Sequence, residues 1–513
     1  VPAVMSTKGI PDDRARLANM TNSTGRNVAQ AGLQSVAGKM GARLIDFGTL
    51  LVLAQLLVPE DFGLIALAMT VVLLIEALSE VPLIQPILRA TDPTPDYYDT
   101  SFTLGVLRAC VLAVVMIGAA WPVAAFYGEP RLPPLIVALT LAPVLRSLIS
   151  PRMAVFARAY NMRPDMMNTL LAKAGAFCVV VIIALLTQSY WAIAAGTITA
   201  PLLMSILSYI KAPYRPRLSL ARWAEFSDVV GWNSVNQLFA ALSFQIDRIL
   251  LGRTLPTADM GRYALASDLT GIPFQGILFP LGAPLTVALA RAETIDQRQR
   301  AWAKVLNAAL CIMGPVLLGL SLLAVPIVQA LLGGTWREMG PILALLALTS
   351  LPSVIGHILA PLAIALYRPK LIAQRTMVDL AVKLPLMLIG IAWFGLWGAI
   401  AARGLAGLAS AGFALTAARQ LTELSVRTQV FALRRTIAGL VVFAILAFWL
   451  CPTVTTSDTG LLGRGGLGLQ TLLAFGVALG GQLATMLVLW QFEKRPHGAL
   501  EGAVMGWFQR RVG

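Results

Sequence analysis

Long apolar runs recur along almost the whole chain, from Val36 to Trp490. Each run is about 20 residues long, which is enough for a helix to cross a hydrocarbon core of roughly 30 Å. Because hydrocarbon offers no partner for backbone N–H and C=O groups, such runs must form helices or a closed barrel. Runs this continuously apolar exclude the barrel. The pattern therefore predicts an all-α polytopic membrane protein.

The apolar runs form two series of six, followed by a last pair. A Pro- and Arg-rich break, KAPYRPRLSLARW, separates the two series. The prediction is 14 transmembrane helices, arranged as two six-helix lobes plus two C-terminal helices. The predicted spans are 36–57, 62–88, 101–126, 132–150, 167–187, 190–210, 227–253, 262–290, 303–332, 341–366, 373–393, 397–418, 436–452 and 469–490.

The polar stretches between the spans set the remaining boundaries. We expect the first residues to be a loose cytoplasmic tail, since they carry no apolar run with a small-residue cleavage site. The predicted units are a polar tail (1–34), an N-lobe (35–210), a basic cytoplasmic linker (211–226), a C-lobe (227–418), a cytoplasmic loop (419–435), the last two spans (436–490) and a cytoplasmic tail (491–513).

An internal repeat supports the two-lobe organisation. Residues 61–68 read DFGLIALA and residues 259–266, which lie 198 positions later, read DMGRYALA. Five of the eight positions match, and each segment lies at the turn between the first and second helix of its lobe. Chance matching in a chain rich in Ala and Leu is the alternative.

Composition and charge agree with a membrane bundle. The chain has 513 residues, of which 57% are hydrophobic and only 13% charged, and its mean hydropathy is +0.75. A soluble domain carries about 25% charged residues. The net charge of +15 is dispersed between apolar spans, so it indicates topology rather than a nucleic-acid partner. Basic residues gather in the loops on the N-terminal side, which places both termini in the cytoplasm.

The sequence lacks the motifs of the common cofactor sites. Its four cysteines have no metal-like spacing, and His357 has no neighbouring ligand, so we expect a packed histidine and no metal. The only GxGxxG, in GRGGLG (463–468), has no preceding strand and is predicted to be a flexible loop. No P-loop is present. We expect neither an enzyme nor a cofactor.

Ionisable residues in the first span are the strongest candidates for function, because charges within a membrane usually face an interior or a water-filled cavity. Lys39, Arg43 and Asp46 are spaced to share one helical face. In the functional interpretation, the two basic residues attract an anionic head group such as a pyrophosphate, while Asp46 orients Arg43 or carries a coupling ion. In the alternative, the three form an internal salt bridge.

Other polar residues within spans are candidates for a passage or gate, or for structural pairing. Arg375, Asp379 and Lys383 follow one another at helical spacing, and we expect them to neutralise one another. Glu76 and Glu80, with Asp46, are candidates for ion coupling. The remaining substrate-cavity candidates are Arg146, Asn233, Asn236, Asp247, Arg248, Asp268, Gln275 and Arg403.

Three segments resemble the polysaccharide transporter (Wzx-type) branch of the multidrug/oligosaccharidyl-lipid/polysaccharide (MOP) exporter superfamily. These are AQLLVPEDFGLIALAMT, NQLFAALSFQIDRILLGRTLPTADMGRYALASDL and LLGGTWREMGPILALLAL. The resemblance covers roughly residues 28 to 490. It implies a MATE-like fold with a central cavity between two lobes, alternating access, and cavity-lining basic residues at the positions of Arg43, Arg248 and Arg403.

The cargo implied by this resemblance is an oligosaccharide linked to undecaprenyl diphosphate, moved across a bacterial inner membrane for a surface or exported polysaccharide. Membrane lipids, glycosyltransferases and a polysaccharide polymerase are the implied partners. A drug or cation antiporter on the same fold is the nearest alternative. A membrane glycan polymerase or ligase is the alternative from another class, but the longest extracytoplasmic loop (about 452–468) holds only Asp458 and Arg464 as ionisable groups.

Overall fold

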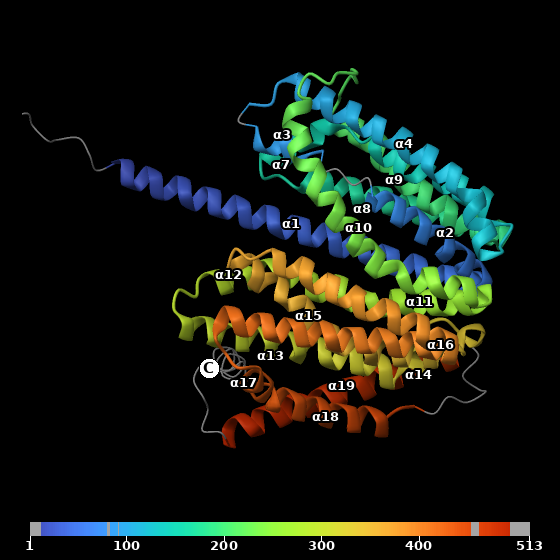
Figure 1. The fold of residues 1–513 in the computed structure, drawn as a ribbon, viewed down its shortest axis with the longest axis vertical. Coiled ribbons are helices and arrows are strands. Elements are labelled where there is room, and N and C mark those ends of the chain that lie inside the picture. The colour runs from blue at the N-terminus through green and yellow to red at the C-terminus, as the bar shows by residue number, and fades with distance from the viewer. Residues whose placement is uncertain (1–11, 79–82, 91, 453–460, 493–513) are drawn as a thin grey trace, which may run out of the picture.

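The computed structural model describes residues 12–78, 83–90, 92–452 and 461–492, and it contains helices but no strand within these ranges (Figure 1). Two groups of helices meet at one end of the molecule, on the right of Figure 1, and diverge towards the left. Helix α1 runs between them. We call the right-hand end, where α2 and α11 begin, the closed end, and the left-hand end the open end.

The first group of helices comes from the N-terminal half of the chain. Its elements are α1 (Asp12–Leu56), α2 (Pro59–Leu78), α3 (Gln85–Arg89), α4 (Pro95–Tyr127), α5 (Leu132–Leu139), α6 (Leu141–Ser147), η1 (Pro151–Met153), α7 (Ala154–Arg158), α8 (Arg163–Thr187) and α9 (Trp191–Lys211). The short 3-10 turn η1 lies between α6 and α7.

The second group begins with α10, which packs against both α2 and α16 and so links the two groups. Its elements are α10 (Trp223–Thr254), α11 (Thr257–Pro273), the π-helical turn η2 (Phe274–Leu278), α12 (Phe279–Ala290), α13 (Ile295–Leu322), α14 (Ala324–Leu331), the 3-10 turn η3 (Gly334–Trp336), α15 (Met339–Ala365), α16 (Lys370–Thr422), α17 (Val426–Ala432), α18 (Arg434–Trp449) and α19 (Leu461–Phe492).

Glycine divides α16 into the two predicted spans. Gly395 has φ 57° and ψ −132°, a backbone conformation outside the helical region that glycine adopts without steric cost. On either side of this turn, Gly390 and Gly398 lie so close that a Cβ on Gly398 would be 2.0 Å from the Gly390 carbonyl oxygen. The break between the predicted spans 373–393 and 397–418 is therefore a tight hairpin.

The described helices confirm an all-α membrane fold but not the number of spans. Eight of them are long and apolar enough to cross a membrane, or up to ten if each of two bent pairs is one span. The count of 14 stays a prediction.

Two local predictions are wrong. Residues 12–34 are helical as part of α1, and residues 463–468 lie within α19 instead of in a loop. In the second case the glycines lie at the start of the last apolar stretch, and Gly468 faces Ala330 of α14 at 3.7 Å from its added Cβ. Small residues of this kind allow helices to pack closely in a membrane.

The internal repeat forms a reciprocal contact between the two groups. A Cβ added to Gly63 on α2 would lie 1.9 Å from the carbonyl oxygen of Thr257, and one added to Gly261 on α11 would lie 1.9 Å from that of Pro59. Positions 59 and 257, like 63 and 261, are 198 residues apart. The two repeat segments therefore pack on each other like the equivalent patches of a two-fold dimer.

Polar contacts reinforce the closed end. Trp336 is fully buried, and its indole N–H donates to the Ala54 carbonyl at 2.6 Å. The Thr257 hydroxyl, at the start of α11, donates at 3.4 Å to Glu129, which lies in the loop after α4. Hydrogen bonds from Arg131 lower the pKa of the Glu129 carboxyl, which keeps this acceptor ionised. These contacts join the first group to the second.

We expect Gly63→Val to separate the two groups at the closed end, because its Cβ meets a backbone carbonyl that cannot rotate away. Cross-linking between Gln55→Cys and Leu331→Cys with a short thiol reagent reports this contact, since the Gln55 amide donates to the Leu331 carbonyl. The four native cysteines are first replaced by alanine. Gly118→Val is the matched control, because open space surrounds its Cβ. Equal cross-linking in Gly63→Val and the control would contradict the assignment.

Candidate functional site

A cavity of about 810 Å³ lies between the two groups of helices, away from the closed end. Helices α1 and α8 form one wall, and η2 with the start of α12 forms the other. Four of the predicted site residues line it together: Lys39, Arg43, Asp46 and Gln275. We call this space the interlobe cavity.

The cavity holds charges of both signs, with a basic excess. Asp46 forms an ion pair of 2.6 Å with Lys173 on α8. This pair replaces the expected pairing of Asp46 with Arg43. The two helices approach closely here because Gly38 and Gly41 of α1 face α8 side chains. Lys173 was missed by the sequence reasoning, although a lysine inside the predicted span 167–187 is itself a signal.

Arg43 remains available in the cavity wall. It is exposed and, within the described part of the chain, forms neither a hydrogen bond nor an ion pair. Lys39, also exposed, lies one turn earlier on the same face of α1. Asp165 lines the same cavity and acts electrostatically on Lys39. The Arg43 guanidinium has no such partner among the described residues and can bind an anion with two parallel hydrogen bonds.

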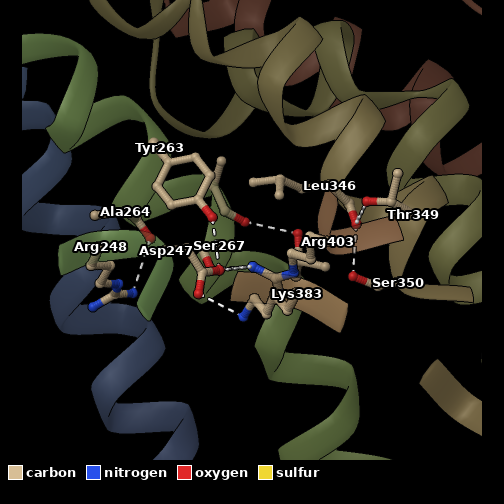
Figure 2. A network of polar contacts seen from close by, with 12 residues as sticks. Asp247, Arg248, Tyr263, Ala264, Ser267, Leu346, Thr349, Ser350, Lys383 and Arg403 are labelled. Carbon is tan, nitrogen blue, oxygen red and sulfur yellow. Dashed lines mark hydrogen bonds and ion pairs between the residues drawn. The ribbon is translucent and has the colours of Figure 1, made fainter. Parts of the chain in front are cut away.

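A buried ion cluster fastens the second group of helices (Figure 2). Figure 2 shows Asp247 of α10 between Tyr263 of α11 and two cations of α16, Lys383 and Arg403. Its carboxylate accepts from Lys383 at 2.7 Å, from Arg403 at 3.3 Å and from the Tyr263 hydroxyl at 2.9 Å. The Asp247 side chain is only 4% exposed. A charge so far from water persists because it is fully paired.

Neighbouring polar groups complete the cluster. The Lys383 ammonium also donates to the Ser243 carbonyl at 2.8 Å, and Arg403 donates to the Ser267 hydroxyl at 3.0 Å. The Ser243 hydroxyl donates to Asp379 at 2.7 Å. Two carboxylates therefore balance two cations across α10, α11 and both halves of α16. The arrangement is suited to holding helices together.

The cluster corrects two sequence predictions. Arg375, Asp379 and Lys383 do not neutralise one another along the helix, since Lys383 pairs with Asp247 and Asp379 accepts from Ser243. Arg403, a predicted cavity-lining cation, instead pairs with Asp247 and does not line the interlobe cavity. In both cases a partner from a distant part of the sequence is nearer than the neighbours along the helix.

The other candidate residues whose side chains the structure describes do not line the interlobe cavity. Arg248 pairs with Asp268, as the structural alternative expected. Arg146, a predicted cavity residue, pairs with Glu76 at 2.9 Å. Three candidates fall on parts that the structure leaves undescribed, namely Glu80 and the side chains of Asn233 and Asn236.

Comparison with known proteins identifies related sequences. A family profile described as polysaccharide biosynthesis protein matches residues 52–341, more than half of the chain. The succinoglycan biosynthesis transport protein ExoT of Rhizobium meliloti (strain 1021) is 26% identical over 319 residues, which cover 61% of this chain and 64% of that protein. The lipopolysaccharide biosynthesis protein WzxC of Escherichia coli (strain K12) is 24% identical over 324 residues, with 61% and 65% covered. The match thus spans just under two thirds of each relative.

Solved structures share the fold. The lipid II flippase MurJ, in an inward closed conformation, superposes with a TM-score of 0.69 over 90% of this chain and 100% of that chain, at 12% identity. An inward-facing multidrug resistance MATE family transporter of the MOP superfamily gives a TM-score of 0.57 over 78% and 95%, at 14% identity. These likenesses confirm the predicted MATE-like fold.

We expect Asp247→Asn to destabilise the protein by about 3–5 kcal/mol, because it leaves Lys383 and Arg403 buried without their counter-charge. Thermal unfolding of the purified protein in detergent measures the effect. Asp247→Asn combined with Lys383→Met removes one stranded cation and should recover part of the lost melting temperature. Asp296→Asn, at the exposed pair with Arg300, is the control and should leave it unchanged. An unchanged melting temperature in Asp247→Asn would show that the cluster does not fasten the helices.

Proposed function

The chain belongs to the polysaccharide biosynthesis protein family, and from this premise we propose that it is a flippase for lipid-linked oligosaccharides in polysaccharide biosynthesis. The observation that carries the proposal is the interlobe cavity, in which Arg43 and Lys39 have no counter-charge within 4 Å among the described residues. The fold shared with MurJ and the names of the two relatives support it.

The physical problem of such a transporter is the polar head group. A diphosphate with several sugars cannot cross hydrocarbon unaided, because each buried charge costs several kcal/mol or more. In the proposed mechanism, Arg43 and Lys39 replace water around the phosphates with charge-assisted hydrogen bonds. The Asp46–Lys173 pair limits the basic excess of the cavity, so that the head group is bound and can also leave.

We propose alternating access as the transport cycle. The described conformation has the cavity at the open end and a sealed closed end, where Gly63 and Gly261 bring the two backbones together. Separation of α2 from α11 would open the opposite side. With the basic loops placed in the cytoplasm, the open end faces the cytoplasm, and both termini are cytoplasmic.

The finer assignments belong to the same proposal. The carrier is undecaprenyl diphosphate, the location is a bacterial inner membrane, and the functional partners are the glycosyltransferases that build the cargo and the polymerase that consumes it. An ion gradient drives the cycle, with Asp46, Glu76 and Glu80 as the candidate coupling residues.

Loss of Arg43 should block export without loss of protein. A charge-assisted hydrogen bond contributes about 1.5–3 kcal/mol, so Arg43→Ala should reduce polymer export roughly tenfold or more. Surface polymer and the cytoplasmic pool of undecaprenyl-linked glycan are measured in a strain that carries the variant as its only copy. Arg43→Lys should restore part of the export.

The controls separate transport from folding. Arg300→Ala removes an arginine on the surface of α13 and should export normally. Arg248→Ala breaks the pair with Asp268 and should lower the protein level together with export. Full export by Arg43→Ala at normal protein level would refute the cavity assignment. Drug resistance on expression, without any effect on the polymer, would instead favour the antiporter.

A further inference from the structure

A second, smaller cavity lies in the second group of helices, next to the interlobe cavity. It has a volume of about 290 Å³ and is enclosed by η2 with α12, by α15 and by the first turns of α16. Phe279 lines both cavities and forms their common wall. Apart from His357 and Arg375, the described lining residues are apolar or glycine. We call this space the side pocket.

Arg375 is a cation without a protein partner in the side pocket. Within the described part of the chain it forms neither a hydrogen bond nor an ion pair. The carboxylate one turn further along α16, Asp379, accepts instead from Ser243. Gly356 of α15 makes room for the guanidinium, because an added Cβ would lie 3.3 Å from its Nη1 atom. The helix packing thus accommodates a half-buried charge, and Asp379 acts on it electrostatically without forming an ion pair within 4 Å.

The contrast with the ion cluster gives this cation its significance. In the ion cluster, which shares α16 with the side pocket, the charged side chains of Asp247, Lys383 and Arg403 form direct ion pairs. Arg375 is half-buried, and its electrostatic partner Asp379 makes no ion pair with it within 4 Å. A partly desolvated guanidinium in this position can accept an additional anion, so Arg375 suits a ligand that carries a negative charge.

The walls and the size of the pocket restrict that ligand further. His357 is held by its Nδ1 contact with the Ser353 carbonyl at 2.7 Å, and its ring packs against Phe274 and Phe279 at 5.4 and 5.5 Å. With one cation among apolar walls, the pocket suits an anionic group attached to a hydrocarbon chain. Its volume of about 290 Å³ is at the lower end of the range for ligand pockets, so it suits a small head group better than an oligosaccharide.

We propose that the side pocket binds the phosphate end of a single-chain lipid phosphate, with Arg375 donating to the phosphate and the apolar walls around the first carbons of the chain. That the hydrocarbon chain of this lipid is an isoprenoid rests on the proposed function. In a flippase it provides a second anion site beside the interlobe cavity, with Phe279 between the two. Phosphate from a lipid and free phosphate share the recognising chemistry, so the experiment tests both.

The test measures binding of radiolabelled farnesyl phosphate to the purified full-length chain in phosphatidylcholine nanodiscs. Farnesol supplies the same chain without the charge, and inorganic phosphate supplies the charge without the chain. We expect farnesyl phosphate to bind at least about tenfold more tightly than either. Arg375→Gln should weaken its binding about tenfold, as for the loss of one charge-assisted hydrogen bond.

A second variant keeps the charge and fills the space. Gly282 lines the side pocket and has nothing within 4 Å of an added Cβ, so Gly282→Leu should fold and block the chain. Gly118→Leu, in equally open surroundings on α4, and Arg368→Gln, at the exposed turn before α16, are the matched controls. Both should bind farnesyl phosphate like the unmodified chain.

Several outcomes would overturn the assignment. One is farnesyl phosphate binding that survives both Arg375→Gln and Gly282→Leu but is lost in Arg43→Ala, which would place the lipid phosphate in the interlobe cavity. Equal binding of inorganic phosphate, or no binding of farnesyl phosphate to the unmodified chain, would also overturn it. These readouts need no transport. Failure of the flippase proposal is instead recognised by normal polymer export in Arg43→Ala.

Discussion

The structure depends on one constraint, namely that hydrocarbon supplies no hydrogen-bond partner and no counter-charge. The backbone meets it by forming helices throughout the described ranges. Side chains meet it by pairing, and the clearest case is Asp247, whose carboxylate is surrounded by Lys383, Arg403 and Tyr263. Two cations of the helices that form no such ion pair among the described residues, Arg43 and Arg375, line cavities.

Paired and unpaired charges have a clear spatial distribution. The ion cluster joins α10, α11 and α16. Its charges neutralise one another, so it stabilises the packing of these helices within the second group. Arg43 in the interlobe cavity and Arg375 in the side pocket lack protein partners within the described chain. Both cavities share Phe279. Our proposals therefore place anion binding in the space between the groups and in the pocket beside it, whereas the ion cluster holds the helices together.

Much of the fold could be predicted from the sequence, because apolar length and periodicity are local properties. The boundary between the predicted spans 373–393 and 397–418 contains Gly395, where the backbone of α16 leaves the helical region. Boundaries were less accurate where local signals were polar or glycine-rich, as at 12–34 and 463–468. Within the site, Lys39, Arg43 and Asp46 were placed together because they share one face of one helix. Their partner on α8 could not be placed, because no local pattern specifies which helices pack together.

By itself the sequence determined the membrane class, the helical register of the charges and the 198-residue repeat. Only the tertiary structure decided the pairings, namely Asp46 with Lys173, Asp247 with two cations of α16, and Gly63 against Thr257. The physical reason is that an ion pair or a backbone contact depends on distances of a few ångströms. Such distances between residues more than a hundred positions apart arise only when the helices are packed.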